Sequence, residues 1–187
     1  EQQAVFEKFD ATKRYRGAEN REGAGTVVPT YLCPSASRRE RRGFTTGDRN
    51  GNGQWDPGDD LAYIDYGGMF GVGLPSYEFM NGVMLYDRIV SAADIRDGLS
   101  NTIVVAEDAG RGPAMNGEWA NGQNVFDQTG RINRTRNNEI FSDHPGGALV
   151  AMCDGSVHFL AESISFETLF ALCTRARGEV ISGNEFP

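Results

Sequence analysis

The pattern of apolar and polar residues is clearest in the last third of the chain. The segment ALVAMC, residues 148–153, is apolar on both faces, as is typical of a central strand. Asp154-Gly155 follows, and this pair favours a type I′ turn, in which both central residues take positive φ. The segment SVHFLAE, residues 156–162, then predicts the returning strand of a hairpin.

A helix is predicted to follow this hairpin and to cover it. Ser165 is a favourable N-cap residue, and Gly178 is a favourable residue to end the helix. The apolar residues between them recur at i, i+3, i+4 and i+7, which places them on one helical face: Phe166, Leu169, Phe170 and Cys173.

The rest of the chain shows shorter elements separated by glycine. Residues 1–10 are typical of the end of a helix, and residues 61–73, 81–90 and 102–108 predict strands. Residues 109–140 are polar and rich in Gly and Asn, so we expect a long ordered excursion with Trp119 as an anchor. The pattern as a whole predicts an α+β fold with an antiparallel β-sheet, an N-terminal helix remnant and long ordered loops.

Composition and charge narrow this picture. The 187 residues are 39% hydrophobic, which suffices for one core, so a single domain over residues 1–187 is expected. The net charge of -8 argues against a nucleic-acid partner, because binding phosphates needs a basic face. The basic run RRERR, residues 38–42, is expected to be a solvated loop. No stretch has the length of a membrane-spanning helix.

Residues 48–59, DRNGNGQWDPGD, resemble a calcium-binding loop. Hard oxygen ligands occur at alternate positions around the glycine turn at Gly53: Asp48, Asn50, Asn52, Gln54 through its backbone carbonyl, Asp56 and Asp59. Asp59 stands where a Glu is usual, and no EF-hand helices flank the loop. We therefore expect a weak Ca²⁺ site, with an Asx-rich turn that binds no ion as the alternative.

The segment DHPGGALVAMCDGSVHF, residues 143–159, holds both histidines of the chain. Three interpretations are open: a catalytic set of Ser142, His144 and Asp143 or Asp154; a metal site of His144, His158 and Asp143; and a folding device. The third is favoured, because no nucleophile elbow is present and Pro145 holds His144 in an extended conformation. His144 is then expected to bond a carbonyl or a carboxylate, while Asp154-Gly155 makes the turn.

Two further groups of residues carry structural expectations. Asp94, Asp97 and their neighbours in DIRDGLSNT, residues 94–102, are expected to satisfy backbone amides around a short helical turn. Cys153 ends the predicted central strand, and Cys173 lies on the apolar face of the covering helix. These two are the best candidates for a disulfide if the protein is exported, with Cys33 left over.

Four ordered motifs resemble one bacterial family. They are YLCPS at 31–35, DIRDGLSNTIVVAED at 94–108, NEIFSDHPGG at 138–147, and His144 followed by nine residues and Asp154-Gly155. The chain resembles pilin-like proteins with a prepilin-type processing-associated H-X9-DG region, known as domain of unknown function 1559. The resemblance covers nearly the whole chain.

The resemblance implies a pilin-like head without enzymatic activity. Such proteins carry an N-terminal hydrophobic helix that a prepilin peptidase cleaves and that packs subunits into a filament. The helix and its cleavage motif do not occur in this sequence, so we expect the globular head alone.

The function expected from the resemblance is that of a structural subunit in a type IV pilus-like or type II secretion pseudopilus-like filament. Its partners would be copies of itself or other pilin-like subunits, and its location extracellular or periplasmic, with membrane contact only through the helix. The alternative is an extracellular carbohydrate-binding or adhesion module that uses Trp119, Trp55 and exposed tyrosines.

Overall fold

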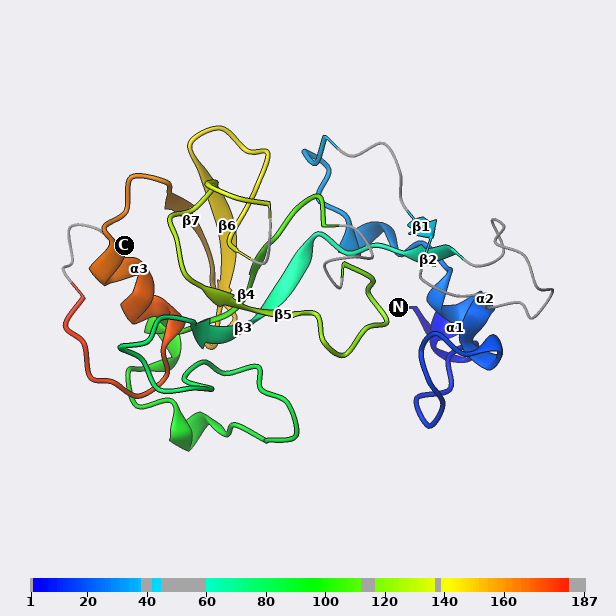
Figure 1. Ribbon diagram of the computed structural model, residues 1–187, viewed down its shortest axis with the longest axis horizontal. Coiled ribbons are helices and arrows are strands. Elements are labelled where there is room, and N and C mark those ends of the chain that lie inside the picture. The colour runs from blue at the N-terminus through cyan, green and yellow to red at the C-terminus, as the bar shows by residue number, and fades with distance from the viewer. Residues whose placement is uncertain (1, 38–41, 45–59, 112–116, 137–138, 182–187) are drawn as a thin grey trace. The chain divides into compact units, whose positions relative to one another are not determined.

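The computed structural model describes residues 2–37, 42–44, 60–111, 117–136 and 139–181 (Figure 1). The chain divides into two compact units, Glu1–Asp65 with Gly110–Asn124 and Tyr66–Ala109 with Val125–Pro187. The polar excursion predicted for residues 109–140 contributes to both units. Among the described residues, no helix combines the length and the apolar character needed to cross a membrane.

The second unit is built on a five-stranded sheet in the order β5-β3-β4-β6-β7 (Figure 1). The strands are β3 (Tyr66–Val72), β4 (Ile103–Glu107), β5 (Val125–Gln128), β6 (Gly147–Met152) and β7 (Val157–Ala161). Two 3₁₀ turns, η4 (Ala92–Asp94) and η5 (Leu99–Asn101), precede β4. The α+β prediction is confirmed.

The sheet is mixed, which corrects the prediction of an antiparallel sheet. β3 and β5 pair in parallel, with Gly68 opposite Val125, whereas β3–β4, β4–β6 and β6–β7 are antiparallel. The chain leaves the sheet at the end of β4 and returns on the far side of β3. β5 therefore runs opposite to β4 and in the same direction as β3, an arrangement that needs a long connection rather than a hairpin.

Residues 81–90 do not form the predicted strand. Val83 and Met84 both donate their backbone N–H to the carbonyl of Met69, at 3.1 and 2.9 Å, instead of alternating along a ladder. Met80 and Asp87 take φ values of 60° and 50° on either side of these contacts. These left-handed residues turn the backbone, so the segment binds β3 only locally.

The hairpin of β6 and β7 is present, but its turn differs from the predicted type I′. Gly155 has φ 88°, and Asp154 is not among the residues of positive φ. The Gly155 N–H donates to the Met152 carbonyl at 3.0 Å, and the Met152 N–H donates to the Ser156 carbonyl at 2.9 Å. This is a three-residue loop, in which a single left-handed glycine completes the turn.

Helix α3 (Phe166–Cys173) packs against one face of the sheet, chiefly against β3 (Figure 1). The Ser165 hydroxyl accepts a hydrogen bond from the Thr168 N–H at 3.2 Å, as expected for an N-cap. The helix ends at Cys173, before the predicted stop at Gly178, because Thr174 is extended. The core contains residues of α3 and of the sheet, among them Met69, Ile103, Val150, Met152, Leu160, Leu169, Leu172 and Cys173.

The first unit consists of short elements joined by ordered loops. They are α1 (Gln3–Phe6), η1 (Ala18–Asn20), α2 (Arg21–Ala24), η2 (Pro29–Tyr31) and the antiparallel pair β1 (Arg42–Phe44) and β2 (Asp60–Ala62). The helix predicted at the N-terminus corresponds to α1, which has four residues. Buried Asn20 fastens the loop after it by accepting from the Asp10 N–H at 2.6 Å and donating to the Asp10 carbonyl at 2.9 Å.

Candidate functional site

The imidazole of His144 lies beside the carboxylate of Glu107, the last residue of β4. His144 Nε2 is 3.2 Å from Glu107 Oε1, and the Glu107 side chain is fully buried. The other carboxylate oxygen of Glu107 accepts the backbone N–H of Leu149 in β6 at 2.7 Å. One carboxylate therefore joins β4, β6 and the segment that leads into β6.

That segment is also fastened through its backbone. Phe141 donates its N–H to the Glu107 carbonyl, and its own carbonyl accepts the N–H of Ala109, both at 2.9 Å. The Ser142 N–H donates to Asn133 Oδ1 at 2.8 Å, and the Ser142 hydroxyl accepts the N–H of His144 at 3.1 Å. These bonds leave the histidine ring aimed at Glu107.

The aspartate and the histidine of the motif lie at opposite ends of β6. The residues from Gly147 to Met152 form the strand between them, and six strand residues span about 20 Å. The nine residues between His144 and Asp154 thus correspond to β6 with its two short end segments. The spacing of the motif reflects the length of this strand.

The structure does not assemble the catalytic set. His144 faces Glu107 rather than an aspartate, and the Ser142 hydroxyl accepts the histidine's own backbone N–H. At the far end of β6, the Ser156 hydroxyl donates to Asp154 Oδ1 at 2.6 Å, so His158, 3.0 Å from the same hydroxyl, is the donor in that contact. The Ser156 proton therefore goes to Asp154 rather than to His158.

The proposed metal set of His144, His158 and Asp143 is not assembled either. His158 pairs across the hairpin with Val150, and its Nε2 contacts Ser156. Asp143 instead forms an ion pair with Arg136 at 2.5 Å. Asp143 and His144 precede the start of β6, whereas His158 lies in β7 beside Ser156 of the turn at the other end of β6.

The turn at Asp154 is stabilised by its carboxylate. Asp154 Oδ1 accepts both the hydroxyl and, at 2.8 Å, the backbone N–H of Ser156. The Ser156 hydroxyl is the main cause of a lowered pKa for Asp154. The aspartate of the motif therefore supports the three-residue loop that Gly155 completes.

The acidic residues of the DIRDG block bond backbone amides. Ser91 and Asp94 form a capping box, in which Asp94 accepts the Ser91 N–H at 2.9 Å and the Ser91 hydroxyl at 2.7 Å. The bond from this hydroxyl is the main cause of a lowered pKa for Asp94. Asp97 accepts the N–H groups of Arg177 and Gly178 at 2.9 and 2.7 Å. This block ties the segment after α3 to the turn before β4.

Trp119 is half-buried and packs against aromatic residues of the first unit. Its ring lies 5.5 Å from that of Phe9 and 6.1 Å from that of Tyr31. Its indole N–H donates to the Thr26 carbonyl at 3.0 Å. Both features are typical of an anchor for the excursion, and Trp55, its predicted companion, lies outside the described residues.

The predicted calcium ligands Asp48, Asn50, Asn52, Gln54, Asp56 and Asp59 also lie outside the described residues. The strands on either side of this segment are described. β1 and β2 pair with Phe44 opposite Asp60 and Arg42 opposite Ala62. The two ends of the segment are therefore held together by a short β-ladder.

The predicted disulfide between Cys153 and Cys173 is not formed, since both thiols are free. Cys173 belongs to the core beneath the sheet, together with Met152, whereas Cys153 follows Met152 in the turn and lies outside that core. Successive residues of a strand point to opposite faces, which separates the two sulfurs. Burial raises the pKa of both thiols.

Glu107 is the residue of this site that the sequence pattern did not single out. It ends the apolar run of β4 and is followed by Asp108, and both residues are fully buried. The sequence did contain a signal for it: two acidic residues directly follow a strongly apolar strand. Carboxylates buried at such a position need hydrogen-bonding partners.

The second unit thus defines a class of protein: an α+β head in which a histidine and a buried glutamate fasten the hairpin that carries the H-X9-DG motif. The family model described as "Protein of unknown function (DUF1559)" matches residues 1–124 and 111–167, and the chain belongs to this family. The family is associated with the prepilin-type H-X9-DG motif and comprises pilin-like secreted proteins that are generally non-catalytic. No curated protein and no solved structure matches the chain.

Proposed function

We propose that the protein is the non-enzymatic head of a subunit in a pilin-like filament of the type IV pilus or type II secretion kind. The main observation in support of this proposal is that the residues of the H-X9-DG motif stabilise the fold of the head. His144 bonds a buried carboxylate that holds strand β6, and Asp154 supports the turn at the other end of the same strand. The motif residues serve the architecture of the head, which is what a structural subunit requires.

Assembly in this proposal depends on an apolar N-terminal helix encoded upstream of residue 1. The filament partners are copies of this protein or other pilin-like subunits, and the head faces the extracellular or periplasmic side. The net charge of -8 makes contacts between heads alone unfavourable, because equal charges repel. An apolar helix supplies the attraction that the heads do not.

Expression of the complete gene with a prepilin peptidase should yield a processed protein that is recovered in filaments sheared from the cell surface. Residues 1–187 alone should remain unassembled at low salt, for the reason of charge given above. The readouts are N-terminal sequencing and electron microscopy with an antibody to the head. A gene that encodes no apolar helix before residue 1, or ordered filaments from residues 1–187 alone, would contradict the proposal.

We also propose that residues 48–59 bind Ca²⁺. The support is the run of oxygen ligands in the sequence together with the β1–β2 ladder that holds the two ends of the segment. Closing those ends reduces the chain entropy that a bound ion has to overcome. Asp59 reaches less far than a Glu, which places the expected affinity at about 0.1 to 1 mM.

Calcium should raise the melting temperature of the protein, and Asp48→Ala should abolish the rise. Free Ca²⁺ at ten times the dissociation constant adds about 1.4 kcal/mol to the free energy of unfolding. For a chain of this length that corresponds to about 3 to 5 °C. Differential scanning calorimetry in EDTA, Ca²⁺ and Mg²⁺ measures it.

The matched control is Glu19→Ala, which removes an exposed carboxylate of the first unit outside the loop. This variant should keep the full response to calcium. A melting temperature that stays constant up to about 5 mM Ca²⁺ would rule out a site even of the weak class.

A further inference from the structure

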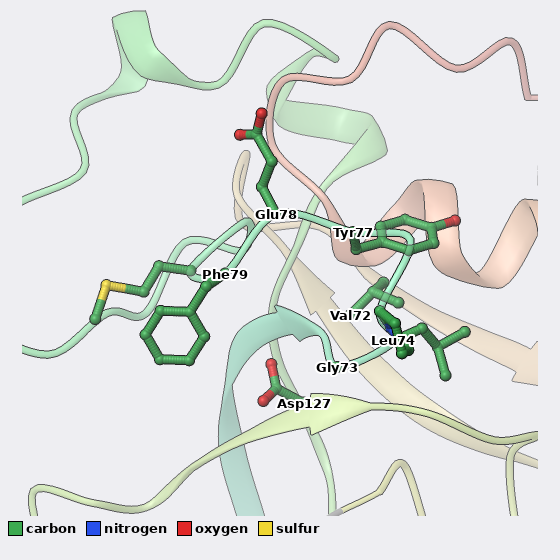
Figure 2. A pocket seen from close by; sticks show the side chains of 9 residues that line it. Val72, Gly73, Leu74, Tyr77, Glu78, Phe79 and Asp127 are labelled. Atoms are coloured by element: carbon green, nitrogen blue, oxygen red, sulfur yellow. The ribbon is translucent and has the colours of Figure 1, made fainter.

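A pocket opens in the second unit between the end of β3, the strand β5 and the loop of residues 73–80 (Figure 2). Its volume is about 340 Å³. Asp127 of β5 contributes a carboxylate, and the loop contributes the rings of Tyr77 and Phe79 and the side chain of Leu74. Acidic and aromatic groups thus line one small space.

The carboxylate of Asp127 points from β5 towards the loop, whereas the Glu78 side chain points away from Asp127 (Figure 2). Asp127 is half-buried, and within the described residues its carboxylate forms neither a hydrogen bond nor an ion pair. Burial, with a smaller contribution from the charge of Glu139, raises its pKa. This anion therefore lacks the neutralising partner that a partly buried carboxylate favours.

Gly73 allows the loop to approach Asp127 closely. A Cβ added at Gly73 would lie 2.8 Å from the Cβ of Asp127, so any side chain there would fill the space beside the carboxylate. The same charge also acts on Tyr86, whose pKa is raised by burial first and by Asp127 second.

The aromatic residues are placed to contact a cation. The Phe79 side chain is 78% exposed although its ring packs 5.5 Å from the buried ring of Phe70. The ring of Tyr77 already forms a cation–π contact: the guanidinium carbon of Arg177 lies 4.0 Å from the ring centroid. The electron-rich faces of such rings attract cations and also cover apolar stems.

Hydrogen bonds from two side chains to the backbone hold the base of the loop of residues 73–80. Asn81 accepts the Val72 N–H at 2.7 Å and donates to the carbonyls of Val72 at 3.1 Å and Glu78 at 2.5 Å. Arg175 Nη1 donates to the carbonyls of Met80 and Gly82. A loop fixed at its base requires little ordering when a ligand binds.

We propose that this pocket binds an organic ammonium ion with an apolar stem, the group that a lysine side chain and a free alkylamine share. The ammonium pairs with Asp127, and the stem lies against Phe79 and Leu74. The two acidic residues of the lining, Asp127 and Glu78, point apart, so they offer too few converging oxygens for Ca²⁺, which takes six to eight. The net charge of -8 favours a cationic ligand. This site is independent of the filament proposal and of the calcium loop.

The probes are n-butylammonium chloride, Nα-acetyl-lysine methylamide and neutral n-butanol, added to residues 1–187 at constant ionic strength. NMR chemical-shift titration should give dissociation constants on the order of millimolar for the two cations, with shifts at Phe79 and around Asp127. n-Butanol should bind at least about tenfold more weakly, because it lacks the charge. Binding should weaken as the pH falls through the raised pKa of Asp127, since the protonated acid no longer attracts a cation.

Asp127→Asn should raise the dissociation constants of both cations by about tenfold or more. It should not lower the melting temperature, because this carboxylate bonds no described residue. Phe79→Leu should raise the same dissociation constants about threefold. The control Glu162→Gln removes the same charge from an exposed residue of the same unit that does not line the pocket, and it should change binding less than twofold.

Stronger binding of the lysine derivative identifies a polypeptide as the source of the cation, and stronger binding of butylammonium identifies a small amine; either supports the site. Equal binding of butanol, full binding by Asp127→Asn, or no shift with either cation overturns the proposal.

Discussion

Replacing His144 by Ala should lower the free energy of unfolding by about 2 to 3 kcal/mol, because Glu107 then loses its charge-assisted partner inside the protein. The carboxylate is fully buried, and its other oxygen accepts the Leu149 N–H. A buried anion that loses a partner incurs its desolvation cost. Urea unfolding followed by circular dichroism measures the change.

The contribution of the pair itself comes from a double-mutant cycle with Glu107→Gln. If the two side chains stabilise the head together, the loss in the double variant is smaller than the sum of the single losses. His158→Ala is the control, since this half-buried histidine lies opposite Val150 in the same hairpin and contacts the Ser156 hydroxyl. It should cost about 1 kcal/mol, less than His144→Ala. An additive cycle, or equal losses for His144 and His158, would show that the histidine motif does not fasten the hairpin through Glu107.

The local elements near the C-terminus could be predicted because their causes lie within a few residues. The alternation in β6 separates buried Ala148, Val150 and Met152 from the opposite face of the strand. Ser165 caps α3 through the Thr168 amide three residues away. Such signals act within one turn or one strand, so a single sequence contains them.

The parallel pairing of β5 was not predictable in the same way. Residues 125–128 are only four, and nothing within them determines whether they pair with β3 or with β4. The connection from β4 to β5 is long, and its residues 110–124 are assigned to the other unit. Strand order therefore depends on contacts that are distant in sequence, and local periodicity does not report them.

Contacts that are distant in sequence also explain why the candidate site was predicted only in part. The sequence indicated that His144 bonds a loop carbonyl or a carboxylate, but the partner, Glu107, is separated from it by 37 positions. The disulfide prediction failed for a related reason. Proximity of Cys153 to the helix followed from topology, yet the one-residue offset from Met152 turns its side chain away from the core.

Asn81→Ala should cost more than the loss of His144, about 3 to 4 kcal/mol, although Asn81 lies far from the motif in sequence. Asn81 is buried, and its amide forms three hydrogen bonds, two of them to the backbone of Val72. Removing the amide leaves the N–H and the carbonyl of Val72 without these partners, each at a cost of about 1 kcal/mol or more. The loop of residues 73–80 would also lose the bond at its base.

Asn81→Asp separates hydrogen bonding from packing, because the two side chains have nearly the same shape. An aspartate retains the bond from the Val72 N–H but places an oxygen against the carbonyls of Val72 and Glu78, so its loss should equal or exceed that of the alanine variant. Asn101→Ala is the control, since that half-buried amide makes one bond, to the Asp97 carbonyl at 3.1 Å, and should cost about 1 kcal/mol. Calorimetry measures the loss in free energy of unfolding for each variant. If the Asn81 variants lose no more than Asn101→Ala, the loop of residues 73–80 is held by Arg175 and by its apolar contacts instead.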